Sequence, residues 1–206
     1  LPPAEALAIP NDIYAYPRAF NSSIDEFLWA QNKKMPEVGI PLPLIVLCHR
    51  VIQLNGLTTD GLFRVNGNKR QVDNVIATCD YTFSVLQGRS IHDHANLIKQ
   101  WFSSLTVPLI PENMTQGMID ASRTDTVLPF VEQLPESHKR TLIYLIGFLQ
   151  QVATGEQETR MGADNLAMCF APNLARVGVN DCNLARKTTA DSKNFLLYLI
   201  GRLDAS

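Results

Sequence analysis

The sequence has no run of about twenty consecutive apolar residues, the length that a membrane-spanning helix needs. It also lacks an excess of either charge, with 18 Lys and Arg against 20 Asp and Glu and a formal net charge of −2 at pH 7. This balance gives no electrostatic reason to expect a nucleic-acid partner. Because 46% of the residues are hydrophobic, the chain is not disordered. A protein or small-molecule partner is therefore the expectation.

Cysteine is scarce, and the first residues do not show the pattern of a secretory signal. The four cysteines, Cys48, Cys79, Cys169 and Cys182, lie far apart, and three of them fall in segments of helical apolar period. Reduced, buried thiols are the ordinary interpretation of that pattern. The opening Leu1-Pro2-Pro3 lacks the basic flank and apolar run of a signal peptide. We expect a cytoplasmic protein, which its partner or other domains could recruit to membranes.

Catalytic and metal-binding patterns are missing too. No Ser-His-Asp or Cys-His arrangement stands in a recognisable context, and no Gly-rich phosphate loop is present, which argues against an independent hydrolase. The triplet His92-Asp93-His94 is the one run that suggests a metal. Neighbouring residues on a helix point apart, and no Cys or acidic cluster completes a site. We expect no metal.

What the sequence does contain is helical periodicity. A length of 206 residues fits one domain. Residues 1–20 are Pro-rich and poorly periodic, so we assign them to an N-terminal extension or linker and residues 21–206 to the domain; the absence of an initial Met favours a fragment of a longer protein. Apolar period, caps and stops predict helices at about 23–31, 41–55, 68–79, 92–105, 112–122, 125–133, 135–154, 162–170 and 191–203. We assign no element to 81–90. Eight or nine helices without strand alternation predict an all-α helical bundle.

A signature segment and five further blocks carry a family resemblance. Residues Gly61-Leu62-Phe63-Arg64-Val65-Asn66-Gly67 resemble the GIFRxSG signature of Rho GTPase-activating (RhoGAP) domains. Further family blocks have similar segments here, in order along the chain: Gly39-Ile40-Pro41, 91–99 ("H-x-x-A-x-L-L-K"), 105–111 ("L-P-E-P-L-I-P"), Leu134-Pro135 and 161–173 ("K-M-x-x-x-N-L-A-x-x-F-x-P-N"). The helix at 23–31 is loosely similar to those in members that follow a tail-homology domain in myosins and related proteins.

The resemblance implies a helical domain that accelerates GTP hydrolysis by a bound Rho-family GTPase, with Arg64 as an arginine finger supplied in trans. Such an arginine neutralises charge on the phosphoryl oxygens in the transition state and adds roughly 10³–10⁵ in rate. Guanidinium suits this role because it stays charged and offers planar, multidentate donors. Arg64 lies in a polar, Gly-flanked loop between two predicted helices. From the loop alone, a solvated or ion-paired arginine is the more ordinary interpretation, and the matching blocks reverse that preference.

Two more contacts carry over from the family. Lys99 corresponds to the lysine that braces the arginine loop and touches the GTPase, and Asn165 to the asparagine that contacts the GTPase switch region. The alternatives are an ordinary exposed helix lysine and a capping or buried structural amide. We interpret Asn173 as a structural loop residue. The resemblance implies no cofactor of its own, because the GTPase contributes GTP, magnesium and the attacking water.

The chain departs from the family pattern on the helix that carries Lys99. Four residues after the lysine, the family usually has an arginine that also faces the GTPase, whereas this chain has Ser103. Docking is then weaker or selective for different partners, since a charge-assisted hydrogen bond is lost. Asp93 and His94 also replace positions that are usually apolar. The alternative function is a catalytically weak or inactive GTPase-binding module of the same fold. The preferred GTPase, whether Rho, Rac or Cdc42-like, does not follow from the sequence.

Overall fold

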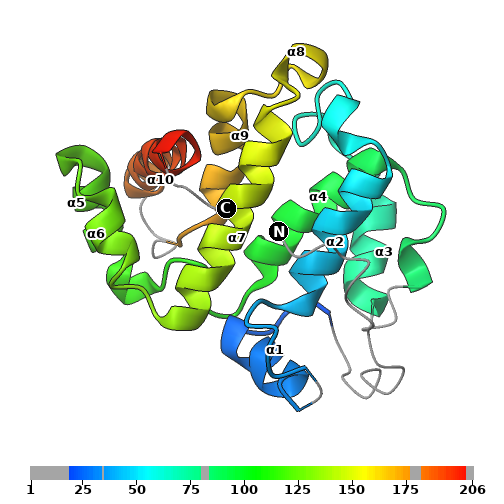
Figure 1. Ribbon diagram of the computed structural model, residues 1–206, viewed down its shortest axis with the longest axis horizontal. Helices are drawn as coiled ribbons and strands as arrows, with labels where there is room; N and C mark the ends of the chain where they lie inside the picture. The colour runs from blue at the N-terminus through cyan, green and yellow to red at the C-terminus, as the bar shows by residue number, and fades with distance from the viewer. Residues whose placement is uncertain (1–18, 34, 80–83, 177–181, 203–206) are drawn as a thin grey trace.

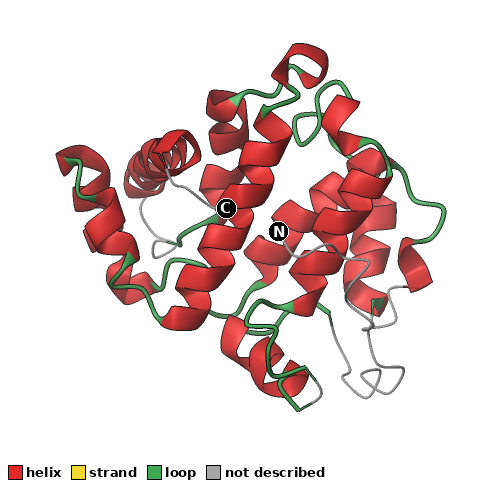
Figure 2. Cartoon of the chain, in the orientation of Figure 1, coloured by secondary structure: helices red, strands yellow, loops and turns green. Residues whose placement is uncertain are grey.

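The structure is a computed structural model, and it describes residues 19–33, 35–79, 84–176 and 182–202. Its α-helices are α1 (Ile24–Gln31), α2 (Leu42–Gln53), α3 (Lys69–Thr78), α4 (Ile91–Ser104), α5 (Thr115–Thr124), α6 (Val127–Val131), α7 (Glu136–Ala153), α8 (Glu156–Thr159), α9 (Ala163–Phe170) and α10 (Cys182–Arg202). Short 3-10 turns are η3 (Gly56–Thr58), η4 (Ser84–Leu86), η5 (Glu112–Met114) and η6 (Ala171–Asn173). Over these ranges Figure 2 shows helices and loops and no strand. The all-α prediction is confirmed.

Local sequence explains where several helices begin. Ser23 starts α1 with a capping box, in which its hydroxyl accepts from the Glu26 amide and Glu26 accepts from the Ser23 amide. Ser90 and Asp93 form the same arrangement at the start of α4. The Asn68 side chain caps α3 by accepting from the Gln71 amide. These caps satisfy amides that the first helical turn leaves without partners.

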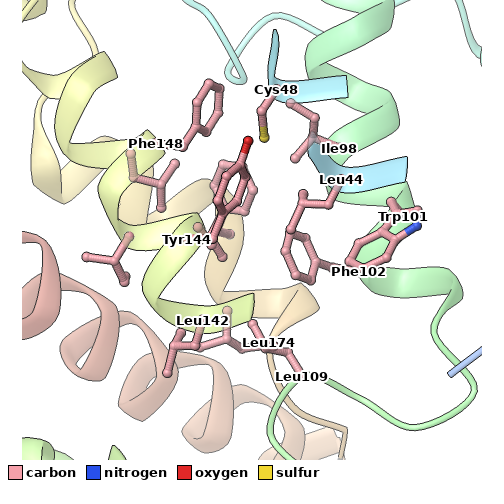
Figure 3. Packing of buried hydrophobic residues seen from close by; sticks show 14 of the residues in the cluster. Leu44, Cys48, Ile98, Trp101, Phe102, Leu109, Leu142, Tyr144, Phe148 and Leu174 are labelled. Carbon is pink, nitrogen blue, oxygen red and sulfur yellow. The ribbon is translucent and has the colours of Figure 1, made fainter. Parts of the chain in front are cut away.

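Helix α7 runs through the middle of the molecule, as Figure 1 shows, with α2, α3 and α4 to one side and α5, α6 and α10 to the other. Helix α10 packs against α5, α7 and α9, while α4 packs against α2 and α3. Figure 3 shows the core between them, where Tyr144 and Phe148 of α7 lie near Leu44 and Cys48 of α2 and face α4. The Trp101 ring of α4 is fully buried and donates Nε1–H to the Ala19 carbonyl at 3.1 Å. This core holds α4 rigidly beneath the loop that carries Arg64.

Two helices differ from the sequence prediction. Helix α10 starts at Cys182 rather than at about Asp191, where the sequence predicts its start. The prediction missed residues 182–190 because they are too polar for an apolar period to show. The one-turn helix α8 was not predicted, since four residues are too few to reveal a period. Of the unassigned segment 81–90, residues 81–83 lie outside the described residues and η4 follows them.

The thiols agree with the sequence interpretation where they are described. Among the described residues, Cys48, Cys79 and Cys169 are not joined in disulfides; the first two are buried and Cys169 is half-buried. Burial raises the pKa of the Cys48 thiol well above its ordinary value. The Cys182 side chain lies outside the described residues. None of the described helices combines the length and apolar character that crossing a membrane requires.

Candidate functional site

A tight turn between α2 and α3 carries Arg64. The carbonyl of Gly61 accepts hydrogen bonds from the amides of Arg64 at 2.9 Å and Val65 at 2.8 Å, and the Gly61 amide donates to the Thr159 carbonyl at 2.8 Å. Gly61 has φ +67°, and a Cβ there would lie 2.8 Å from Val65 Cγ2. Only glycine meets both conditions without strain. The turn is therefore closed on itself and tied to the segment before α9.

Phe63 anchors this turn in the core. Its backbone has φ +69°, which is rare for a bulky residue and costs roughly 1–3 kcal/mol. Its ring is buried and makes edge contacts with Phe170 and Phe148, at centroid distances of 4.9 and 6.1 Å. Burial of the ring offsets a cost of that size, since an apolar side chain of this kind contributes about 1.5–3 kcal/mol. Because Phe63 points inward, Arg64 follows it on the outer side of the turn.

The Arg64 side chain is half exposed and only loosely paired. Its Nη2 lies 3.4 Å from Asp60 Oδ1, and the two side chains are 50% and 59% exposed. The same oxygen lies 3.9 Å from Arg160 Nε. Exposed ion pairs of this kind contribute little, typically about 0–1 kcal/mol. The guanidinium can therefore leave Asp60 at small cost and bind an anion outside the molecule.

Lys99 reaches the same turn from α4. Its Nζ donates a hydrogen bond of 2.7 Å to the Phe63 carbonyl, one residue before Arg64. Burial lowers the pKa of Lys99. Burial also raises the pKa of the nearby Cys169 thiol, and the positive charges of Lys99 and Arg64 partly oppose that rise. Lys99 is thus more than an ordinary exposed helix lysine. Cys169, on α9, is a neighbour of the site that the sequence gave no reason to expect.

Asn165 lies exposed in the first turn of α9. Its Nδ2 donates to the Arg160 carbonyl at 3.0 Å, and Arg160 has a left-handed backbone with φ +56°. This side chain is a surface amide with one local partner, not a buried one. Met168, one turn further along α9, and Val65, beside Arg64, are large apolar side chains with exposed fractions of 55% and 45%. Polar and apolar groups of both segments are therefore available to a partner.

Ser103 is used within the chain. Its hydroxyl donates to Oδ1 of Asn173, and the Asn173 side chain donates to the Cys169 carbonyl at 3.4 Å. The guanidinium of Arg176 donates to the carbonyls of Ser103 and Leu105. Asn173 thus links α4 to the end of α9, in agreement with the structural role expected for it. A cation that sequence reasoning did not notice, Arg176, lies at the end of α4.

Two residues of the triplet at the start of α4, Asp93 and His94, are engaged with backbone groups. Asp93 is buried and accepts from the amides of Ser90 at 3.1 Å and Asn68 at 2.6 Å. His94 is buried, its Nδ1 lies 2.8 Å from the Ser90 carbonyl, and burial lowers its pKa. Within the described ranges, no three His, Cys, Asp or Glu side chains gather as a metal site would require. The Ser-x-x-Asp spacing of residues 90–93 is a sequence signal for the cap of α4. No sequence signal indicates the bond from the Asn68 amide to Asp93.

Comparison with known proteins gives one consistent family. The model of the RhoGAP domain matches residues 42–178. The chain is 31% identical over 190 residues to GTPase activating protein homolog 2 of Dictyostelium discoideum, with 90% of this chain and 21% of that protein covered. It is also 31% identical over 172 residues to Rho GTPase-activating protein 4 of Homo sapiens, with 78% and 17% covered. The chain thus spans about a fifth of the length of these relatives.

The fold has a solved counterpart. The crystal structure of human Rho GTPase activating protein 15 superposes with a TM-score of 0.77 and covers 100% of this chain and 98% of that one. The sequence identity is 19%, so this likeness concerns the fold alone.

Proposed function

Because the chain belongs to the RhoGAP domain family, we propose that it accelerates GTP hydrolysis by a Rho-family GTPase, with Arg64 inserted into the active site of that partner. A RhoGAP domain is a GTPase activator and not itself an enzyme, and the family binds no cofactor of its own. GTP and magnesium belong to the partner. The location is cytoplasmic, in keeping with the reduced cysteines. The curated relatives are much larger proteins, so further domains would supply regulation.

The observation that carries this proposal is the state of Arg64. Its guanidinium is half exposed and held by a single weak ion pair among the described residues, while the backbone beneath it is fixed by Phe63 and Lys99. A side chain that must reach another protein needs that combination of a rigid base and a free end. Lys99 and Asn165 lie on the two helices, α4 and α9, that approach the turn. We assign them supporting contacts with the GTPase.

The mechanism follows from charge. In the transition state of phosphoryl transfer, negative charge spreads over the phosphoryl oxygens, and a guanidinium held against them lowers the barrier. Among the described residues of the isolated chain, Arg64 is paired with the carboxylate of Asp60. Its contact with phosphate therefore forms only once the partner is bound. The exchange of Asp60 for phosphate replaces a solvated ion pair with charge-assisted hydrogen bonds in a site closed to water.

Single-turnover GTP hydrolysis by a panel of Rho, Rac and Cdc42-like GTPases tests the proposal and ranks the partners. Arg64→Ala is expected to abolish acceleration, a loss of about 10³–10⁵-fold, while most binding to the GTP-bound partner remains. Arg64→Lys is expected to be poor as well, because an ammonium lacks the planar fork. Wild-type rates from Arg64→Ala would overturn the mechanism.

The rival is a catalytically weak or inactive GTPase-binding module. Ser103 favours it weakly, since its hydroxyl is engaged with Asn173 and offers no charge to a partner. The retained Arg64 favours the activator. A wild-type chain that binds GTP-loaded partners across the panel without accelerating any of them would establish the rival instead.

A further inference from the structure

Asp93 is a buried carboxylate that no step of the proposed mechanism uses. It lies in the first turn of α4, and its side chain is 3% exposed. One oxygen, Oδ2, accepts from the Ser90 amide at 3.1 Å and completes the capping box. The other, Oδ1, accepts from the Asn68 amide at 2.6 Å. This second bond has no part in capping α4, since Asn68 belongs to the end of the Arg64 turn.

Gly67 packs directly against the same residue. A Cβ added at Gly67 would lie 2.5 Å from Asp93 Oδ1, 2.7 Å from its Cα and 2.9 Å from its amide nitrogen. Backbone atoms in the capped first turn of a helix cannot move aside as a side chain can. The turn therefore approaches α4 as closely as a backbone without a side chain allows, and this approach brings the Asn68 amide to the carboxylate.

The two bonds from α4 bracket Arg64. Lys99 holds the Phe63 carbonyl on one side of the arginine, and Asp93 holds the Asn68 amide on the other. Asp93 and Lys99 are less than two turns apart on one rigid helix. A segment tied only at Phe63 could pivot about that point, whereas ties at both ends fix the direction in which Arg64 leaves the backbone. Catalytic groups need such fixing, because a displacement of about 1 Å can cost roughly 100-fold in rate.

We propose that Asp93 is a positioning residue for Arg64, which clamps the C-terminal end of the arginine turn onto α4 through the Asn68 amide. The proposal rests on the proposed function, because it presumes that Arg64 acts in the partner's active site. Asp93 does not itself touch the GTPase. Its loss should therefore reduce the rate in the bound complex more than it reduces association.

The test compares Asp93→Ala with Ser90→Ala, which removes the hydroxyl that accepts from the Asp93 amide but leaves the bond to Asn68. Acceleration is measured with the panel GTPase that the wild-type chain accelerates most, over a range of activator concentrations. For Asp93→Ala we expect the saturated rate to fall by about 10–100-fold, with a half-saturating concentration within about threefold of wild type. For Ser90→Ala we expect both values to stay within about twofold. Thermal unfolding confirms that the variants are folded.

Two further variants and a second readout keep structural damage apart from positioning. Asp93→Asn retains an oxygen that can accept from Asn68 and should recover most of the rate, whereas Gly67→Ala should lower it as Asp93→Ala does. Hydrogen exchange of the Asn68 amide should accelerate at least tenfold in Asp93→Ala but not in Ser90→Ala. Equal saturated rates for Asp93→Ala and Ser90→Ala, or an Asn68 amide that stays protected in Asp93→Ala, would overturn the proposal. Full acceleration by Arg64→Ala would instead overturn the role of Arg64 on which the proposal rests, and a wild-type chain that accelerates no GTPase of the panel would overturn the proposed function.

Discussion

Lys99 and Asn165 hold different parts of the site, although both are assigned supporting contacts with the GTPase. As supporting contacts that do not reach the phosphates, both residues would affect association more than the saturated rate. Lys99 Nζ, however, donates to the Phe63 carbonyl beside Arg64. Asn165 Nδ2 donates to the Arg160 carbonyl. Over the described residues, Asn165 makes no hydrogen bond to the Arg64 turn. The two residues should therefore differ in which kinetic quantity they control.

We predict that Lys99→Ala lowers the saturated hydrolysis rate and also raises the half-saturating concentration, by about tenfold each, the equivalent of about 1.4 kcal/mol and close to the value of a hydrogen bond from a charged group. Asn165→Ala should raise the half-saturating concentration by a few-fold and leave the saturated rate unchanged. Lys99→Arg, which can still donate to Phe63, is the control. Titration of the activator at constant GTPase gives both quantities. Identical patterns for Lys99→Ala and Asn165→Ala would contradict the division.

At the scale of elements, the end of α4 differs from the expectation based on Ser103 alone. From the sequence alone, Ser103→Arg adds a cation one turn beyond Lys99 and should strengthen association by about 0.5–3 kcal/mol in a salt-sensitive way. Arg176 already places a guanidinium on the Ser103 and Leu105 carbonyls. A new arginine would also break the bond from Ser103 to Asn173. Part of the missing charge is thus supplied from the segment after η6.

We predict that Ser103→Arg in the wild-type chain changes the affinity for the preferred GTPase by less than about threefold, because like charges at the end of α4 repel. In a chain that carries Arg176→Ala, the same substitution should strengthen association by about tenfold, within the range of a charge-assisted hydrogen bond. Affinities at two ionic strengths provide the measurement, since a charge effect shrinks with salt. Equal gains in both chains, or no salt-sensitive gain in either, would show that Arg176 does not substitute for the missing arginine.

The helices followed from the sequence wherever the signal was local. The serine before Ile24 marked the start of α1, and apolar period marked α2, α4, α7 and α9. Among the described side chains in the first half of α10, Arg186 and Lys187 are exposed, and the buried ones, Thr188 and Asp191, are polar, so no apolar period shows. Its helical state depends on packing against α5 and α9. Contacts of that kind join residues far apart in sequence and leave no local trace.

The site divides in the same way. Motif spacing located Arg64, Lys99 and Asn165, but it could not show that Phe63 takes a left-handed backbone or that Asp93 accepts from Asn68. Both features depend on α4 and α9 lying against the turn. The bond from the Gly61 amide to the Thr159 carbonyl is a further example, because it joins segments almost a hundred residues apart. The sequence therefore indicated which residues we propose to act, and the fold shows what holds them.

At the scale of the whole molecule, the boundary of the domain is open to test. The sequence assigns residues 1–20 to an extension, with the domain beginning at residue 21. Yet the Ala19 amide donates to the Cys79 carbonyl at 3.1 Å, and the Ala19 carbonyl accepts from Trp101 at 3.1 Å. Phe20 is 1% exposed. These two residues join the end of α3 to the buried face of α4, the helix that supports Arg64, so we propose that the folding unit begins before residue 21.

We predict that a chain starting at Asn21 unfolds at a lower temperature than one starting at Arg18, since the two differ only in Arg18, Ala19 and Phe20. Loss of a fully buried phenylalanine costs about 3–5 kcal/mol, and the Trp101 N–H left without an acceptor adds about 1–3 kcal/mol. At roughly 2–4 °C per kcal/mol for a domain of this size, the midpoint should fall by at least about 8 °C. Phe20→Ala in the full chain isolates the packing contribution and should account for more than half of the loss. Calorimetric scans of the three proteins decide where the domain begins. Equal midpoints for the chains starting at Arg18 and Asn21 would place the boundary at residue 21. The expected loss would show that Ala19 and Phe20 belong to the folded domain and support α4, the helix that holds the arginine turn.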